Sequence, residues 1–217
     1  MPVACGRFAN FSKGPTLPAN TAERPDDHDL TPADRLLAEI ERLRSDLGAA
    51  ERKIAELEAR ADIDPLLEIF NRRGFERELA RSLAYVKRYG TDAALMVIDL
   101  DGFKAVNDRH GHAAGDALLK AVAAALRAKV RASDVVARLG GDEFGVLLWN
   151  VDGSRAAAKV IELENVIAQV RAEHGGVALQ VGASAGAVSL APESGADAII
   201  DAADKAMYAR KHGRRGA

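Results

Sequence analysis

The sequence predicts an α/β sandwich in which helices flank a central, largely antiparallel sheet, with one long helix preceding it. Helical and strand-like hydrophobic patterns alternate from about residue 62 onward, which is typical of a layered α/β domain. Two strand-like runs, 135–139 and 144–149, are separated only by a tight turn. Such a hairpin excludes a purely parallel sheet, because parallel strands need a long crossover connection.

Composition limits the classes of function. The chain has 217 residues, of which 48% are hydrophobic and 29% charged, as expected for one folded domain with an appendage. Its formal net charge of -2 provides no general attraction to nucleic acid or to an anionic membrane. We expect no nucleic-acid partner and no membrane span, since no apolar run approaches spanning length. The single cysteine and the lack of a signal-peptide pattern favour a cytoplasmic location.

The N-terminal part of the chain contains two expected segments. Residues 1–30 are rich in Gly, Pro, Ser, Asn and Asp and lack periodicity, so we expect a disordered tail. A helix is expected to follow, with Thr31 as the N-cap, Pro32 at the first helical position and Asp34 completing the cap. The globular domain is expected over residues 62–217.

The expected helix over 31–61 carries a heptad seam. Its apolar residues recur at spacings of four and three: Leu36, Ile40, Leu43, Leu47, Ala50, Ile54, Leu57 and Ala61. Three charge pairs would meet across a parallel dimer: Glu39 with Arg44, Lys53 with Glu58, and Asp46 with Glu51. The first two attract and the third repels, which favours a parallel, coiled-coil homodimer. The alternative is a solitary amphipathic helix that packs on its own domain.

The elements of the globular domain are expected in a fixed order. Asn71 is a suitable N-cap for the first helix, the apolar run at 93–100 indicates a buried strand, and an alanine-rich segment after Gly115 indicates a long helix. The full set is a helix over 72–88, a strand over 93–100, the helix after Gly115, strands over 135–139 and 144–149, a helix over 154–172, strands within 177–189 and a helix over 197–211.

The hairpin turn carries the candidate chemistry. Gly140 and Gly141 permit backbone conformations that a side chain forbids, and the carboxylates of Asp142 and Glu143 follow at the tip. Taken alone, this segment would be interpreted as an ordinary solvated turn.

A second acidic segment ends the preceding strand, where Asp99 and Asp101 lie on the same side because side chains alternate. If the hairpin tip meets this strand end, the carboxylates converge and need a cation, for which oxygen ligands favour Mg²⁺ or Mn²⁺. The chain has no Gly-x-x-x-x-Gly-Lys-Ser/Thr loop, so nucleotide use would depend on these carboxylates.

Four segments of the chain carry motifs in a fixed order: Asp99–Asp108, Gly111–Asp116, Arg138–Phe144, which reads RLGGDEF, and Ala203–Tyr208. Together these segments resemble the GGDEF family of diguanylate cyclases. The resemblance covers residues 62–215 and implies a nucleotide-cyclase-like fold. It implies an enzyme that condenses two GTP molecules into cyclic di-GMP and pyrophosphate. Each subunit of a homodimer would hold one GTP, which gives the coiled coil a purpose.

The resemblance also implies the metal and catalytic roles. Asp99, Asp142 and the carbonyl of Leu100 would bind two Mg²⁺ ions, with Mn²⁺ as a substitute. Asp142 would take the proton from the attacking 3′-hydroxyl, with Glu143 assisting at the metals and in the chemistry. The metals would activate that hydroxyl and stabilise the leaving pyrophosphate.

The remaining implied contacts concern GTP. The guanine would be bound by Asn107 and Asp116 with His112 nearby, because amide and carboxylate groups can match its donor-rich edge. The triphosphate would lie near the following residues: Phe103, Lys104, Gly140, Gly141, Lys211 and Arg215, with Arg214 as an alternative to Arg215. Singly, each has a plainer interpretation: Asn107, His112 or Asp116 as helix-capping residues, and Lys104 as a solvated charge.

Arg131 and Asp134 form a second candidate site. Their Arg-x-x-Asp spacing precedes the hairpin where the family has its product-inhibition site, so the resemblance implies that cyclic di-GMP binds there as an inhibitor. Arg can supply a fork to guanine or phosphate, and Asp can accept from guanine. The alternative is an ordinary surface ion pair.

The chain departs from the family at Leu67 and Glu68, where Thr and Gly are usual. This loop joins the helix to the domain, so regulation is affected more than chemistry. Other classes of function stay open: a catalytically weak module that senses GTP or cyclic di-GMP, or a scaffold. The input signal and any upstream regulatory protein are not identified by the sequence.

Overall fold

The computed structural model describes residues 31–191 and 193–215, without the side chains of residues 54–61, 214 and 215. The expected tail, residues 1–30, lies outside this range. The chain divides into one unit that ends at Glu51 and a second that runs from Arg52, and each is described by itself. None of the described helices is long and apolar enough to cross a membrane.

The first helix, α1 (Pro32–Ala61), begins at the cap that the sequence predicts. The backbone N–H of Asp34 donates to Oγ1 of Thr31 over 3.2 Å, and the backbone N–H of Thr31 donates to Oδ2 of Asp34 over 3.0 Å. These reciprocal bonds satisfy two backbone donors at the start of the helix.

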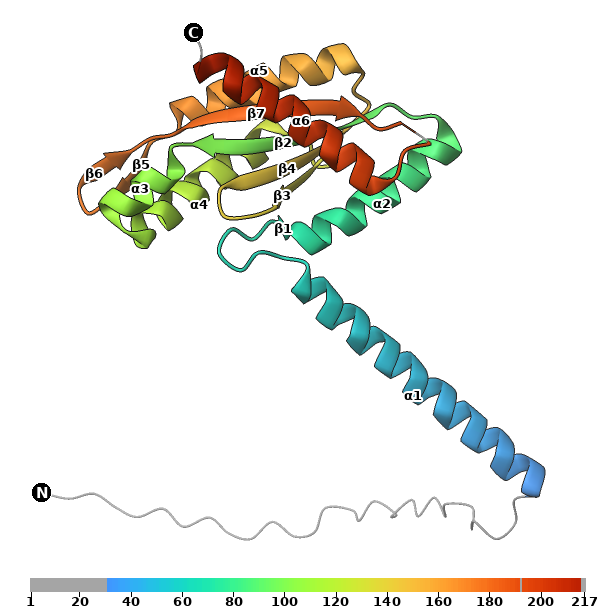
Figure 1. Ribbon diagram of the computed structural model, residues 1–217. Coiled ribbons are helices and arrows are strands. Elements are labelled where there is room, and N and C mark those ends of the chain that lie inside the picture. The colour runs from blue at the N-terminus through green and yellow to red at the C-terminus, as the bar shows by residue number, and fades with distance from the viewer. Residues whose placement is uncertain (1–30, 192, 216–217) are drawn as a thin grey trace, which may run out of the picture. The chain divides into compact units, whose positions relative to one another are not determined.

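A five-stranded sheet forms the centre of the second unit (Figure 1). Its strands are β1 (Phe70–Asn71), β2 (Ala93–Asp101), β3 (Val135–Arg138), β4 (Glu143–Trp149) and β7 (Gly182–Ser189), arranged in the order β1-β3-β4-β2-β7. Every neighbouring pair is antiparallel except β1 with β3. The prediction of a largely antiparallel sheet flanked by helices is therefore confirmed.

Helices cover both faces of the sheet. One face packs against α2 (Arg72–Tyr89) and α6 (Ala196–Arg215), and the other against α4 (His112–Lys129) and α5 (Gly153–Gln169). The short α3 (Phe103–His110) packs beside α4. Side chains of β2 alternate between the two cores, because successive residues of a strand point to opposite faces.

Most expected elements are present, with shifted ends. Asn71 caps α2 by accepting the backbone N–H of Gly74 over 3.0 Å, as predicted. The alanine-rich helix begins at His112, before Gly115, and the helix expected to reach residue 172 ends at Gln169. Three short elements were not predicted: β1, α3 and β5 (Ala172–His174), which forms a two-stranded sheet with β6 (Val177–Leu179). Short segments carry too few residues for a periodic pattern.

The loop before β1 contains the departure at Glu68. Glu68 has a φ of 54°, in the left-handed region that disfavours any side chain with a Cβ. The turn requires this conformation, since the N–H of Glu68 donates to the carbonyl of Asp64 and the N–H of Asp64 to the carbonyl of Ile69. The GGDEF family that the sequence resembles usually has Gly at this position. In this protein Glu68 adopts the same left-handed backbone conformation, for which Glu is less suitable than Gly.

Glu68→Gly should stabilise the protein by about 0.5–1 kcal/mol, because Gly relieves the left-handed strain by more than it adds to unfolded-state entropy. Urea denaturation would measure the change. Glu76→Gly is the matched control: Glu76 is exposed within helix α2, and there the same substitution should cost about 1 kcal/mol. A loss of stability at both positions would contradict the strain at Glu68.

Candidate active site

Acidic side chains from two neighbouring strands meet on the α2/α6 face of the sheet. Asp99 of β2 lies directly opposite Glu143 of β4 in the antiparallel register, and directly opposed residues share a face. The backbone N–H of Leu100 donates to the carbonyl of Asp142 over 3.1 Å. The hairpin tip therefore lies beside the end of β2, and the carboxylate of Asp142 is close enough to Glu143 to raise the pKa of Glu143.

Each of the two paired carboxylates is met by a cation from a covering helix. The ammonium of Lys211, on α6, contacts the carboxylate of Asp99, and both side chains are largely buried. Arg72, the first residue of α2, places Nη2 3.5 Å from Oε2 of Glu143. Its Nε also donates to the carbonyl of Leu139 over 2.7 Å. The like charges on this face are thus partly neutralised by helices on either side.

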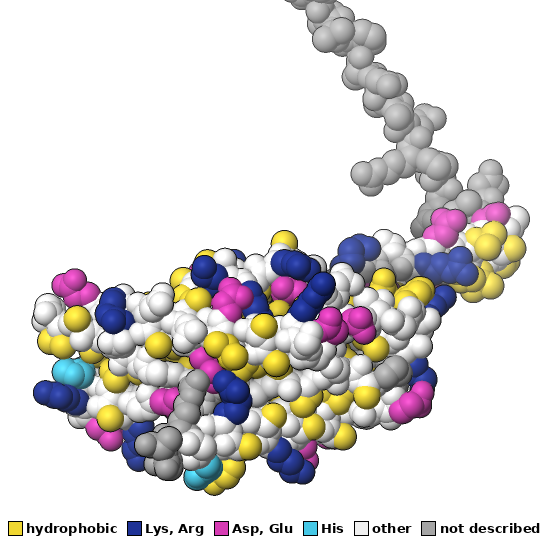
Figure 2. Space-filling view, turned by 90° about the horizontal axis from the view of Figure 1, so that it is seen from above, with side chains coloured by type: hydrophobic (Ala, Val, Ile, Leu, Met, Phe, Trp, Pro, Cys, Tyr) yellow, Lys and Arg dark blue, Asp and Glu magenta, His cyan; other side chains and the backbone are white. Residues whose placement is uncertain are grey.

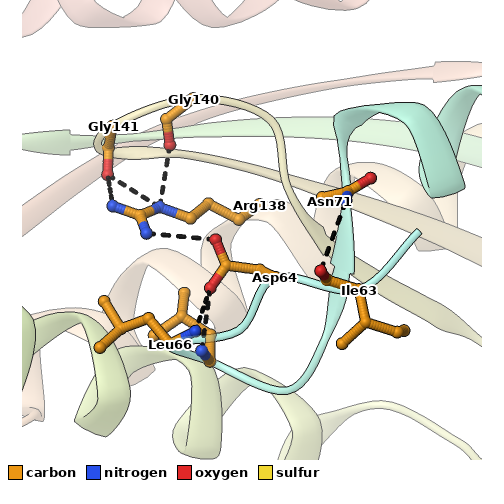
Figure 3. A network of polar contacts seen from close by, with 8 residues as sticks. Ile63, Asp64, Leu66, Asn71, Arg138, Gly140 and Gly141 are labelled. Atoms are coloured by element: carbon orange, nitrogen blue, oxygen red, sulfur yellow. Dashed lines mark hydrogen bonds and ion pairs between the residues drawn. The ribbon is translucent and has the colours of Figure 1, made fainter. Parts of the chain in front are cut away.

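Arg138 fixes the backbone of the hairpin turn (Figure 3). Its guanidinium donates to the carbonyl of Gly141 over 2.8 Å and to that of Gly140 over 3.1 Å. A third nitrogen lies 3.2 Å from a carboxylate oxygen of Asp64, whose other oxygen accepts two backbone N–H groups of its own loop. This planar fork joins the turn to the loop that precedes β1.

Burial perturbs two carboxyl groups near the hairpin. Burial raises the pKa of Glu143 above its usual range, Arg72 opposes this, and Asp204, Asp99 and Asp142 add to the rise. Burial also raises the pKa of Asp204, on α6, again against Arg72. A hollow of about 450 Å³ opens beside Glu143 and Asp204. Glu143 is therefore easier to protonate than a solvated carboxyl group.

The candidate guanine residues lie on α3 and α4. The amide oxygen of Asn107 is buried and has no hydrogen-bond partner in the described part of the chain. It occupies the space where a Cβ of Gly115 would lie, only 1.9 Å away, so any larger residue there would displace it. Asp116 is the next residue of α4 and is exposed, as is His112 in the first turn. An unsatisfied buried acceptor indicates a missing donor at this place.

The remaining candidate residues differ in their exposure. The ring of Phe103 is buried in the core, which leaves only its backbone at the start of α3 to face a ligand. Lys104 is exposed in the first turn of α3, and Gly141 is exposed at the hairpin tip beside half-buried Gly140. The side chain of Arg215 lies outside the described residues.

The donor chemistry near the hairpin fits a hard cation in part. The carboxylates of Asp99, Asp142 and Glu143 offer the oxygen ligands that Mg²⁺ prefers. Asp101 is already engaged, because the hydroxyl of Ser184 donates to its carboxylate over 3.0 Å. Within residues 31–191 and 193–215, no three His, Cys, Asp or Glu side chains are grouped closely enough to hold an ion by themselves. Other oxygen ligands, such as phosphates, would have to complete the shell.

Arg131 and Asp134 have different surroundings. The carboxylate of Asp134 accepts the backbone N–H of Arg131 over 2.8 Å and that of Trp149 over 3.1 Å. Arg131 is exposed, and its contact with Asp134 is made by its backbone N–H. Both line a hollow of about 450 Å³.

Sequence reasoning missed several residues of the site: Arg72, Asp204, and the pair of Asp64 with Arg138. Arg72 carried one signal, since it directly follows the helix cap, but nothing in the sequence relates it to a hairpin about 70 residues later. Such contacts depend on how α2 and α6 pack on the sheet.

Residues 61–217 match the family model described as "Diguanylate cyclase, GGDEF domain". The chain belongs to this family. The chain is 42% identical over 178 residues to a probable diguanylate cyclase, DgcE, of Escherichia coli, in a match that covers 79% of this chain and 16% of the relative. The first curated relatives are longer, and the chain spans between 16% and 48% of their length.

Solved structures support the same fold. A sensory box/GGDEF family protein from Caulobacter crescentus is 36% identical with a TM-score of 0.65, covering 70% of this chain and 99% of that one. The coiled coil and GGDEF domain of DgcB from the same organism, in complex with c-di-GMP, is 25% identical with a TM-score of 0.69. That match covers 82% of this chain and 95% of the solved chain, which holds the coiled coil and GGDEF domain of DgcB.

The surface charge of the GGDEF domain is mixed where Figure 2 displays it. Lys and Arg side chains lie among Asp and Glu side chains, without a broad patch of one sign on this face. This mixture agrees with the net charge of -2. It offers no extended surface for a polyanion on that face.

Glu143→Gln should stabilise the fold in a pH-dependent way. Because the pKa of Glu143 is raised in the folded state, its ionisation weakens the fold as pH rises through the carboxyl range. The neutral variant should gain about 0.5 kcal/mol or less at pH 7, since solvent screens a side chain that is 41% exposed. The gain should disappear below about pH 4, where the carboxyl is protonated in both states.

Urea denaturation across this pH range would test the effect, with Glu76→Gln on the exposed surface of α2 as the control for the amide itself. A stability difference that does not change with pH would contradict the assignment.

Proposed function

We propose that this protein is an active diguanylate cyclase that converts two GTP molecules into cyclic di-GMP and two pyrophosphates. In each half-reaction, a 3′-hydroxyl oxygen bonds to the α-phosphorus of the other GTP. The bond from that phosphorus to the bridging oxygen breaks, and pyrophosphate leaves. The observation that carries the proposal is the register of β2 with β4, which opposes Asp99 to Glu143 and brings Asp142 beside them.

The carboxylates have two roles, proton transfer and metal binding. Asp142, half-buried at the hairpin tip, accepts the proton of the attacking hydroxyl, and Glu143 beside it assists. Asp99, Asp142 and the carbonyl of Leu100 would hold Mg²⁺, with Glu143 assisting. When bound, Mg²⁺ would stabilise the negative charge that develops on the phosphate oxygens.

The remaining residues hold the nucleotide. The buried amide oxygen of Asn107 accepts an N–H of guanine, and Asp116 accepts from the same edge. Lys104 and Lys211 provide positive charge for the triphosphate. Phe103 contributes through its backbone at the start of α3, because its ring belongs to the core.

Asp99→Asn and Asp142→Asn should each lower turnover by a factor of about 100 or more, because an amide is a poor ligand for Mg²⁺ and a poor base. The assay incubates purified protein with GTP and Mg²⁺ and separates the products by chromatography. Asp92→Asn, at an exposed position before β2, is the control. Near-native turnover by a folded Asp142→Asn variant would refute the site. Binding of cyclic di-GMP by a wild-type protein that makes none would favour the sensor function instead.

We propose that residues 31–61 form a parallel coiled coil that brings two GGDEF domains together. The seam residues with described side chains support this, since Leu36, Leu43 and Leu47 are each more than half exposed in the single chain. Exposed apolar residues at heptad spacing are stabilised when a second helix covers them. Glu39 already pairs with Arg42 of its own helix, so its pairing with Arg44 of a second chain must compete with that contact.

Changing Leu43 and Leu47 together to Lys should produce monomers and reduce specific activity at low protein concentration, because buried like charges oppose pairing. Sedimentation velocity and initial rates over a dilution series would measure both effects. The double change of Ala38 and Ser45 to Lys, at exposed positions off the seam, adds the same two positive charges and is the control. If the variant is a monomer and keeps its full specific activity, the proposed role of the helix is wrong.

We also propose that cyclic di-GMP binds at Arg131 and Asp134 and inhibits the enzyme. The hollow beside Arg131 and the exposure of that residue support this. Both carboxylate oxygens of Asp134 hold backbone N–H groups, so Asp134 also maintains the turn before β3. Arg131 is therefore the better residue to change.

Arg131→Ala should weaken the binding of cyclic di-GMP about tenfold to a hundredfold, the scale of losing hydrogen bonds to a charged group. Initial rates should change little, while late product should rise as inhibition is relieved. Calorimetry and progress curves with added cyclic di-GMP measure the two effects, and Arg88→Ala, at an exposed position of α2 away from this hollow, is the comparison. Equal binding and equal inhibition of wild type and Arg131→Ala would leave the site without support.

A further inference from the structure

A buried carboxylate on α5 joins three elements at the edge of the sheet. The side chain of Glu164 is only 3% exposed. One of its oxygens accepts the backbone N–H of Ala185 over 2.9 Å, and the other accepts Nη2 of Arg210 over 2.9 Å. Ala185 belongs to β7 and Arg210 to α6. A buried carboxylate with these partners is specifically placed, because an unpaired one would be costly.

The position of β7 explains why one residue can reach all three elements. β7 is the outer strand of the sheet, so alternate N–H groups along its free edge have no strand partner. Helices α5 and α6 pack on opposite faces, and both contact β7. Glu164 satisfies one edge N–H and reaches around the edge to α6 on the other face.

A second contact fixes α6 against the same strand. At Gly186 of β7, a Cβ would lie 2.1 Å from the backbone nitrogen of Met207, so α6 rests directly on the strand backbone. Met207 and Arg210 are three residues apart and lie on one side of the helix. The contact at Gly186 sets the distance of α6 from the sheet, and the pair of Arg210 with Glu164 sets its rotation. Lys211 is the next residue.

We propose that Glu164 is a positioning residue for Lys211, which it holds against Asp99 by fixing the rotation of α6 through Arg210. The inference rests on the proposed function, since Asp99 and Lys211 belong to the proposed site. The backbone of α6 transmits the restraint over a single peptide unit. Without the charge of Glu164, the helix keeps its contact at Gly186 but rotates more freely, and the ammonium of Lys211 spends less time at Asp99.

The first test needs no nucleotide. A double-mutant cycle of Asp99→Asn and Lys211→Met, measured by urea denaturation, gives the coupling between these side chains. The same cycle in a Glu164→Gln background should yield at most half of that coupling. Gln keeps an acceptor for the N–H of Ala185 and removes only the charge that holds Arg210. An unchanged coupling would overturn the proposal.

The second test measures nucleotide binding. The probe is 3′-deoxy-GTP with Mg²⁺, which lacks the attacking hydroxyl and so binds without reacting. Glu164→Gln should weaken its binding about three- to tenfold, the scale of one impaired charged contact. In a Lys211→Met background, the same substitution should have no effect. Equal losses in both backgrounds would indicate a general structural role and overturn the proposal.

Matched variants complete the design. Glu162→Gln lies on the same helix and removes a different ion pair, with Lys159, so it should change neither measurement. Arg210→Met should reproduce Glu164→Gln, and Arg210→Lys should restore part of the effect; they also serve if Glu164→Gln folds poorly. Failure of wild type to bind 3′-deoxy-GTP would contradict the proposed function, while the nucleotide-free cycle would still decide the role of Glu164.

Discussion

Mutual repulsion between carboxylates is the constraint on which the rest of the site depends. Antiparallel pairing forces Asp99 and Glu143 onto one face of the sheet, and the hairpin adds Asp142 beside them. Two cations offset this repulsion. Arg72, at the start of α2, pairs with Glu143, and Lys211, near the end of α6, pairs with Asp99. Both helices must therefore keep their positions on that face if the carboxylates are to stay neutralised.

The backbone of the hairpin is restrained as firmly as its side chains. Arg138 binds the carbonyls of Gly140 and Gly141 and reaches Asp64 in the loop before β1. Arg72 binds the carbonyl of Leu139, the residue that immediately precedes the two glycines of the turn. A glycine-rich turn is intrinsically mobile, and these bonds reduce that mobility where reacting groups must be placed accurately.

The sequence predicted the features that depend on local pattern. The layered fold, the cap at Asn71 and the antiparallel hairpin followed from periodicity and turn residues, and the structure contains them. The sequence could not predict that Asp99 lies beside the hairpin tip, because the register between distant strands depends on tertiary packing. The contacts of Arg72 and Glu164 could not be predicted from local pattern, since their partners lie about 70 and 20–50 residues away. For Glu68, the sequence shows that Glu replaces the usual Gly. The resulting backbone strain follows only from its φ of 54° in the structure.

The carboxylate of Glu164 also affects how this protein avoids self-association. An outer strand with unpaired N–H groups is a template onto which a strand of another chain can add. At Ala185 that template is interrupted, because an incoming carbonyl would have to displace a buried, charged acceptor and leave Arg210 without its partner. The same side chain that restrains α6 thus protects the open border of the sheet against edge-to-edge aggregation.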